Sequence, residues 1–208
     1  MDRKMEISAL VLAGGRGERM GKEKLFLSVD STPLVERVLR VLHPLAGEIL
    51  LSVALRQVPS ARGTLSDIMS AYGIRLVEDR AAGRGPLEGI ASGLAAAKFR
   101  WSFVCACDMP FLSPEVIRML WNQGDHRASV ILPRIGGYLE PLHAFYSSEA
   151  LSAARRLLDR GERKISALYD ELAVSIVEEE AFAGLYGFRR SFYNVNLQKD
   201  LSVLCSPR

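Results

Sequence analysis

The residues best suited to do chemistry lie in the segment LAGGRGERMGKEK, which covers positions 12–24 directly after an apolar run. Glycines let main-chain N–H groups turn toward an anion without interference from a Cβ atom, and basic side chains add positive charge. The glycines and basic residues concerned are Gly14, Gly15, Gly17, Arg16, Arg19, Lys22 and Lys24. This combination predicts a loop that binds a polyphosphate, and the alternative is a surface turn whose charges are only solvated.

Two well-known phosphate-binding loops do not match the segment. A P-loop requires Ser or Thr after Gly-Lys, but Glu23 follows Gly21 and Lys22 here. The dinucleotide-binding fingerprint requires a third glycine where Met20 stands, together with an acid at the end of the second strand, and the sequence offers neither. The loop is therefore expected to hold phosphates with a different arrangement of residues.

Acidic residues follow two other apolar runs. Asp108 comes after the run at 101–106 and before Pro110, where it could hold Mg²⁺ against phosphates or simply form the turn. Asp79 comes after the run at 74–78 and has the same alternative of a turn residue. From the residues alone, both interpretations stay open.

Other polar or soft side chains carry weaker signals. Cys105 and Cys107 would share one face of a strand, but the sequence has no second cysteine pair, so they are expected to be small buried hydrophobic residues. His143 could lie near an acceptor pocket, although a buried histidine at a strand end is the preferred interpretation. Asn194 and Asn196 alternate, so they could read a polar ligand such as a pterin or form a turn.

Two arginine pairs complete the set of candidate residues. Arg155 with Arg156 and Arg189 with Arg190 are interpreted as solvated surface charge, and either pair could also meet an acidic partner or a phosphate.

Apolar runs bounded by turn residues predict strands, and apolar residues at helical spacing predict helices. The expected strands cover residues 7–12, 48–53, 74–78, 101–106, 128–133, 142–146 and, as a short one, 173–177. The expected helices cover residues 33–45, 86–98, 113–124 and 148–160. Because strands and helices alternate, we expect one three-layer α/β domain with a mostly parallel sheet covered on both faces.

Local signals refine three of these helices. Thr32 is suited to cap the first helix, with Pro33 at its first position. Gly89 and Gly93 weaken the alanine-rich second helix and indicate that it packs closely on a neighbour. Ser113 is suited to cap the third.

Composition excludes several classes of protein. The chain has 208 residues, 49% of them hydrophobic and 25% charged, which is typical of a soluble globular domain. A net charge of +3 is too small to indicate a nucleic-acid surface. The first apolar run is short and lacks a cleavage pattern, and no stretch is long enough to span a bilayer. With only three cysteines, the protein is expected in the cytoplasm, without a membrane or nucleic-acid partner.

The pattern LAGGxxxRMGxxK resembles the nucleotide-binding signature of the molybdenum cofactor guanylyltransferase family, whose members are MobA-like nucleotidyltransferases. Further blocks resemble that family at 77–79 with 85–87, at 107–110, at 161–163 and at 194–196, so the resemblance covers almost the whole chain. The family usually continues with Thr-Pro after the last asparagine, whereas this chain has Leu197 and Gln198. This departure concerns the shape of the turn beside the acceptor.

The resemblance implies a Rossmann-like α/β/α nucleotidyltransferase domain over residues 1–208. It implies transfer of GMP from GTP to the molybdopterin-bound molybdenum cofactor, with release of pyrophosphate and transient contact with molybdenum-cofactor handling proteins. The catalytic residues it implies are Arg19, Lys24 and Asp108, with Asp108 holding Mg²⁺. The nucleotide- or cofactor-binding residues it implies are Leu12, Ala13, Gly14, Gly15, Lys24, Asp79, Gly85, Asn194 and Asn196.

Three alternatives to this activity remain at this point. Related cytidylyltransferases resemble LAAG where this chain has LAGG, and Gly14 indicates room for a purine, so GTP is favoured over CTP. Uridylyl or another nucleotidyl transfer to a sugar phosphate is a second alternative. A non-catalytic protein that binds the nucleotide or the cofactor is the third.

Overall fold

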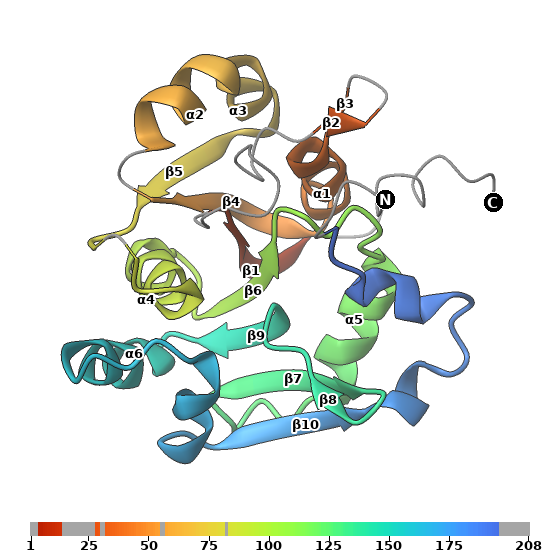
Figure 1. The fold of residues 1–208 in the computed structure, drawn as a ribbon. Coiled ribbons are helices and arrows are strands. Elements are labelled where there is room, and N and C mark those ends of the chain that lie inside the picture. The colour runs from red at the N-terminus through yellow and green to blue at the C-terminus, as the bar shows by residue number, and fades with distance from the viewer. Residues whose placement is uncertain (1–3, 14–27, 30–31, 55–56, 82, 196–208) are drawn as a thin grey trace.

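The structure, a computed structural model, describes residues 4–13, 28–29, 32–54, 57–81 and 83–195. Its centre is a sheet with the strand order β10-β7-β9-β6-β1-β4-β5, and β8 pairs with β7 at one side (Figure 1). The strands of this sheet are β1 (Met5–Leu12), β4 (Ala46–Val53), β5 (Ile74–Glu78), β6 (Trp101–Ala106), β7 (Val130–Ile135), β8 (Tyr138–Leu139), β9 (His143–Ser147) and β10 (Val174–Glu178). A separate antiparallel pair consists of β2 (Ser28–Val29) and β3 (Thr32–Pro33).

The pairing confirms a mostly parallel sheet. β5, β4, β1 and β6 are parallel neighbours, and β10 is parallel to β7. β9 runs antiparallel to both β6 and β7, and β8 runs antiparallel to β7. The structure therefore has the predicted fold class.

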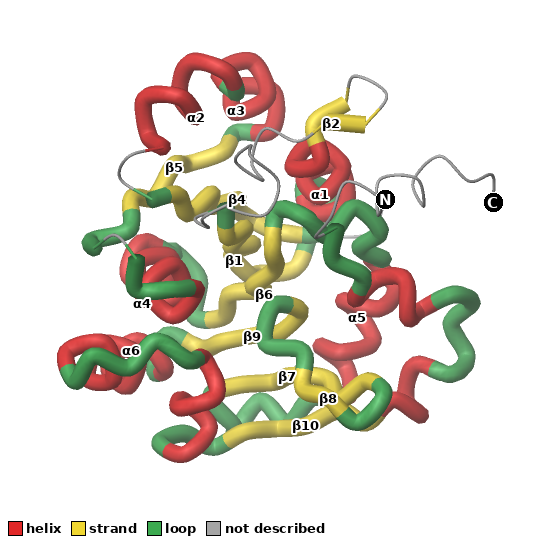
Figure 2. Tube along the Cα trace, in the orientation of Figure 1, coloured by secondary structure: helices red, strands yellow, loops and turns green. Residues whose placement is uncertain are grey.

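Helices cover both faces of the sheet, as the tube in Figure 2 shows. The helices are α1 (Leu34–Leu42), α2 (Val58–Thr64), α3 (Ser66–Tyr72), α4 (Pro86–Ala96), α5 (Pro114–Gln123) and α6 (Ala150–Asp159), and the 3-10 helices are η3 (Ile165–Asp170), η4 (Glu179–Phe182) and η5 (Phe188–Phe192). Alternate side chains of β1 enter two separate cores. Ile7, Ala9 and Val11 pack in the core that includes α1 and α5, whereas Leu10 and Leu12 pack in the core that includes α4 and α6. Burial on both faces explains why this strand is apolar without alternation.

Some element boundaries differ from the sequence prediction. Pro33 is the residue that precedes α1 rather than its first residue, and Thr32 pairs with Val29 in the β2–β3 ladder instead of capping the helix. The helix ends at Leu42 because Pro44, which has no N–H, cannot continue the helical hydrogen bonds. The remaining predicted boundaries differ by up to two residues. Ser113 caps α5 as expected, with its hydroxyl accepting from Val116 N–H at 3.2 Å.

Two short helices, α2 and α3, were not predicted from the sequence. Pro59 and Gly63 lie in the first of them and give that stretch a low helix propensity. Tertiary packing overrides this propensity, because Ala61 and Leu65 are buried in the core on the α1 side of the sheet. α3 has no fully buried residue, but Ile68, Met69 and Tyr72 lie at helical spacing and pack against the same core, a signal that the sequence prediction did not use.

Close packing of α4 on the sheet was predicted from its glycines, and the structure confirms it. A Cβ atom at Gly93 would overlap the side chain of Leu10 on β1. At Gly89 an added Cβ would lie 3.0 Å from the Ser52 hydroxyl and 3.1 Å from the Leu12 side chain. The missing side chains therefore let α4 approach the sheet.

The chain that follows η4 is anchored to the sheet through a buried histidine. His143, at the start of β9, is fully buried, and its Nε2 lies 2.9 Å from the Ser191 hydroxyl of η5. The same hydroxyl accepts from Ser113 N–H at 3.0 Å, so it joins η5 to the start of α5. Burial lowers the pKa of His143 to about 3. The interpretation of His143 as a buried strand-end residue is confirmed.

The first prediction concerns the contact between α4 and β1. Gly93→Ala should lower the free energy of unfolding by about 1–3 kcal/mol, since the methyl group overlaps Leu10 and the helix must shift. The measurement is equilibrium urea unfolding. Gly63→Ala is the matched control, because nothing lies within 4 Å of its added Cβ, and in α2 it should stabilise the protein slightly. Equal effects of the two substitutions would contradict the packing argument.

The second prediction concerns His143. Because its pKa falls from 6.5 in the unfolded chain to about 3 when folded, the unfolded state binds the extra proton and stability falls as the pH drops below 6.5. Between pH 7 and pH 5 the loss from this residue should be about 2 kcal/mol. His143→Gln should remove that part of the pH dependence in urea unfolding, whereas His126→Gln, at an exposed histidine, serves as the control. An unchanged pH dependence in His143→Gln would contradict the assignment.

Candidate functional site

The carboxyl ends of the parallel strands meet at one edge of the sheet, where ligands bind in this architecture. Main-chain hydrogen bonds continue past the strand ends there. Ala13 N–H donates to Ser52 O at 2.8 Å, and Cys107 N–H donates to Leu12 O at 3.1 Å. Ala13 is therefore held in register at the point where the glycine-rich loop begins, and the ends of β1, β4 and β6 are fixed relative to one another.

Asp108 lies at this edge, two residues after β6, and is almost completely buried. Its carbonyl oxygen accepts a hydrogen bond from Val195 N–H at 2.9 Å. This contact brings Asn194, nearly ninety residues later in the chain, next to Asp108. The structure thus brings the main chain at Asn194 beside that of Asp108, two residues that the sequence analysis selected.

Asp79 lies at the same edge, directly after β5. Its Oδ1 accepts a hydrogen bond of 2.6 Å from the Ser52 hydroxyl, and its main-chain N–H donates to Val53 O at 3.0 Å. Burial raises the pKa of Asp79 to about 6, the Ser52 hydrogen bond opposes this shift, and the nearby Glu88 carboxylate adds to it. At neutral pH the carboxylate is mostly ionised and can accept hydrogen bonds.

Gly85 begins α4 in a conformation that favours glycine, with φ of 72°. A Cβ atom there would lie 3.4 Å from the carbonyl oxygen of Arg163. The loop at 161–163 therefore lies against the start of α4, so two segments that each resemble a family block are neighbours in space. Helix N-termini carry free N–H groups, which gives this corner a favourable potential for an anion.

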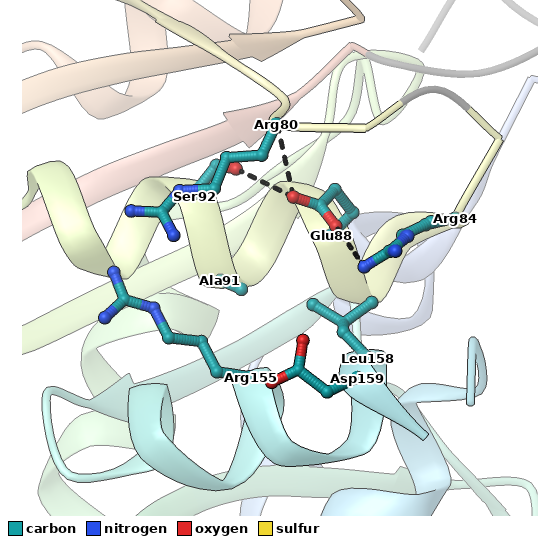
Figure 3. Close-up of a pocket in the computed structure, with 8 residues that line it drawn as sticks. All are labelled: Arg80, Arg84, Glu88, Ala91, Ser92, Arg155, Leu158 and Asp159. Atoms are coloured by element: carbon teal, nitrogen blue, oxygen red, sulfur yellow. Dashed lines mark hydrogen bonds and ion pairs between the residues drawn. The ribbon is translucent and has the colours of Figure 1, made fainter. Parts of the chain in front are cut away.

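Several polar groups near this edge were not selected from the sequence. Ser52 is fully buried near the end of β4, and its hydroxyl donates a hydrogen bond to Asp79. A hydroxyl residue inside an apolar run is the sequence feature that could have identified it. Glu88 is a buried carboxylate. Its position as a charged residue inside an alanine- and glycine-rich helix could have identified it in the same way. Figure 3 shows Glu88 among the residues that line a cavity of about 70 Å³ between α4 and α6.

The arginine pairs are exposed, as predicted, and Arg190 in addition contacts an aromatic ring. Arg156 forms an ion pair with Glu171 at 2.9 Å, and Arg189 forms one with Glu179 at 2.6 Å. Arg190 also stacks over the ring of Phe111, with 4.4 Å between the guanidinium carbon and the ring centre. Together with Tyr193, these side chains line a cavity of about 240 Å³.

The two cysteines after the start of β6 are buried, as predicted for small hydrophobic residues. Cys105 and Cys107 lie in the core on the α1 side of the sheet, and burial raises the pKa of the Cys105 thiol. Within the described residues, no group of three or more His, Cys, Asp or Glu side chains is arranged to hold a metal ion. A metal that used Asp108 would therefore need other ligands besides the protein side chains described.

Five of the predicted site residues lie outside the described residues: Gly14, Gly15, Arg19, Lys24 and Asn196. The six others, Leu12, Ala13, Asp79, Gly85, Asp108 and Asn194, lie at the carboxyl edge or at the adjacent start of α4. No helix in the described part of the chain has the length and apolar character needed to cross a membrane.

Comparison with known proteins places the chain in a family. Residues 9–175 match the family described as MobA-like NTP transferase domain. Probable molybdenum cofactor guanylyltransferases from Pelotomaculum thermopropionicum and Methanosarcina mazei are each 35% identical, over 95% and 93% of this chain and 91% and 88% of their own lengths. The crystal structure of molybdopterin-guanine dinucleotide biosynthesis protein A from Archaeoglobus fulgidus has a TM-score of 0.77 and 29% identity, covering 97% of this chain and 98% of that one. The match over most of the domain, the near-complete coverage of these relatives and the shared fold show that the chain belongs to the MobA-like NTP transferase family and is a nucleotidyltransferase.

Proposed function

We propose that the protein transfers GMP from GTP to the molybdopterin-bound molybdenum cofactor, forming the guanine dinucleotide cofactor and pyrophosphate. The observation that carries the proposal is the gathering of Asp79, Asp108 and Asn194 at the sheet edge where the glycine-rich loop begins. Relatives named molybdenum cofactor guanylyltransferase support the choice of substrates, since they are 35% identical over nearly the whole chain. We place the reaction in one domain and in the cytoplasm, with transient contact to proteins that handle the molybdenum cofactor.

The chemistry requires little proton transfer from the protein. An oxygen of the acceptor's terminal phosphate attacks the α-phosphorus of GTP, a new P–O bond forms, and the bond from the α-phosphorus to the bridging oxygen breaks to release pyrophosphate. The second pKa of a phosphate monoester is around 6, so the attacking oxygen is largely ionised at neutral pH. A strong general base is therefore unnecessary, and the protein's task is positioning and charge neutralisation.

The loop after β1 would hold the triphosphate. Main-chain N–H groups of Gly14 and Gly15, together with Arg19 and Lys24, would contact the phosphate oxygens, and Leu12 and Ala13 would fix the start of the loop through their main-chain hydrogen bonds. Each cation near the leaving pyrophosphate stabilises the negative charge that develops there.

Asp108 is our candidate Mg²⁺ ligand. Its carboxylate is a hard oxygen donor at the carboxyl edge, and Mg²⁺ typically uses one or two carboxylates together with water and substrate phosphates. A single protein carboxylate therefore fits Mg²⁺ better than it fits a metal that needs a complete protein cage. When bound, the ion would neutralise charge on the phosphate oxygens.

The remaining residues would orient the two substrates. Asp79 and Gly85 lie on the β5–α4 side of the edge and would bind the nucleotide, whereas Asn194 lies beside Asp108 and, with Asn196, would bind the pterin of the acceptor. GTP is favoured because Gly14, in the LAGG that stands where related cytidylyltransferases resemble LAAG, would leave room for a purine. CTP transfer to the same cofactor is the second candidate. The third is a non-catalytic binding protein, which would be recognised because it releases no pyrophosphate.

The third prediction concerns the charged groups of this mechanism. Asp108→Asn and Lys24→Ala should each lower the rate of pyrophosphate release about a hundredfold or more, by analogy with the loss of a single oxyanion donor. The assay supplies Mg²⁺, GTP and molybdopterin, and circular dichroism verifies folding. Arg100→Ala is the control, because Arg100 precedes β6 at the opposite edge and contacts Glu149. Near-normal turnover in either site variant would remove that residue from the mechanism.

The fourth prediction concerns the base. Calorimetric titration of the wild type with GTP, CTP, ATP and UTP in the presence of Mg²⁺ should show selective binding of GTP, and Lys24→Ala should abolish it. A preference for CTP or UTP would leave the family assignment unchanged but would contradict the assignment of GTP as the substrate. Absence of binding to all four nucleotides would contradict the assignment of the loop.

A further inference from the structure

Glu88 is a buried carboxylate to which the proposed mechanism gives no role. Its side chain is 4% exposed, although it lies at the third position of α4, only three residues from Gly85. Glutamate is rarely buried unless its charge is paired or hydrogen bonded. The contacts of this carboxylate therefore indicate what it does.

The strongest of these contacts leaves the helix to which Glu88 belongs. A glutamate at the third helical position often turns back to the residue that precedes the helix, but here Oε1 accepts from the main-chain N–H of Arg80 at 3.2 Å. The Ser92 hydroxyl lies 3.4 Å from the same oxygen, and Arg84 Nη1 lies 4.0 Å from Oε2 (Figure 3). The side chain thus joins α4 to the turn after β5.

That turn carries Asp79, because Arg80 is the next residue. From the sheet side, Asp79 is held by the Ser52 hydroxyl at 2.6 Å and by its own N–H bond to Val53. From the helix side, α4 packs so closely that a Cβ at Gly89 would lie 3.7 Å from Asp79 Oδ1. Asp79 is therefore fixed between β4 and α4, and Glu88 provides the hydrogen bond from α4 to the main chain beside it.

We propose that Glu88 is a positioning residue for the nucleotide site, because its carboxylate holds the Arg80 main chain and thereby fixes Asp79 in the place where it meets GTP. This inference rests on the proposed function of Asp79. Fixing a binding group before the ligand arrives reduces the ordering that binding would otherwise require. The Glu88 charge also acts on Asp79 directly, since it helps to raise the pKa of that carboxyl.

Among the described residues, the charged groups around the two carboxylates come from five segments. Arg84 lies beside Glu88 at the start of α4, and Arg80 lies on the turn itself. Glu78, before the turn, forms an ion pair of 3.8 Å with Arg62 of α2. From α6, Arg155 and Asp159 line the cavity beside Glu88. Burial and the Glu88 charge together raise the pKa of Asp79 to about 6, so removing the Glu88 charge should lower that pKa.

The fifth prediction separates positioning from a merely structural role with two variants. Glu88→Gln keeps an oxygen that can accept from Arg80 N–H but removes the charge, and Glu88→Ala removes both. In calorimetry from about pH 5 to pH 8 with Mg²⁺, Glu88→Ala should bind GTP about tenfold more weakly, the factor for loss of one hydrogen bond. Glu88→Gln should bind GTP as tightly as the wild type at high pH. In acid, its affinity should begin to fall at a lower pH than that of the wild type, because the pKa of Asp79 is lower without the Glu88 charge.

Two readouts on the nucleotide-free protein make the test independent of GTP. Amide hydrogen exchange should show that the Arg80 N–H is protected in the wild type and in Glu88→Gln but exposed in Glu88→Ala. The carboxyl carbon shift of Asp79 should titrate at lower pH in Glu88→Gln. Asp159→Asn is the matched control, because it removes a carboxylate from the same cavity and should leave affinity, exchange and titration unchanged.

The outcomes distinguish this inference from the function on which it rests. Failure of the wild type to bind GTP would overturn the proposed function, together with the nucleotide role of Glu88. GTP binding that is lost in Asp79→Asn but unchanged in both Glu88 variants would overturn the positioning role alone. If Glu88→Ala fails to fold, hydrogen exchange of the wild type still decides the question, since an unprotected Arg80 N–H would show that the Glu88 carboxylate does not hold the Arg80 main chain.

Discussion

The parallel pairing of β1 with β4 and β6 is the constraint on which the rest of the structure depends. Parallel strands require crossover connections, so the helices must cover the two faces and the carboxyl ends must share one edge. The register is continued past the strand ends by the Ala13–Ser52 and Cys107–Leu12 hydrogen bonds. The start of the glycine-rich loop and the segment before Asp108 are consequently positioned by main-chain bonds, which depend little on individual side chains.

Close packing of α4 on the sheet encloses one side of this edge. Gly93 and Gly89 bring the helix against Leu10 and Leu12, and the same approach places the helix beside Asp79. A carboxylate in this confined space loses hydration, which explains the raised pKa of Asp79. The absence of side chains at two positions of one helix therefore contributes both to the packing of the core and to the electrostatics of the site.

The last described segment completes the edge from the other side. β9 is antiparallel to its neighbours, and His143 at its start lies against Ser191, so η5 is held over the end of the sheet. The chain then runs to Val195, whose N–H reaches the Asp108 carbonyl. A neutral buried histidine thus contributes to the nucleotide edge by anchoring a distant segment, without contact with the chemistry.

The sequence by itself determined the fold class, the succession of the main strands along the chain and the positions of the acids at the strand ends, because these follow from local apolar runs and turn residues. It also indicated the close packing of α4 through Gly89 and Gly93. Only the tertiary structure decided that α2 forms, that Thr32 pairs in a strand, that the Ser52 hydroxyl binds Asp79, and that Glu88 binds the main chain of Arg80. These features depend on contacts between residues far apart in the chain, which no local pattern encodes.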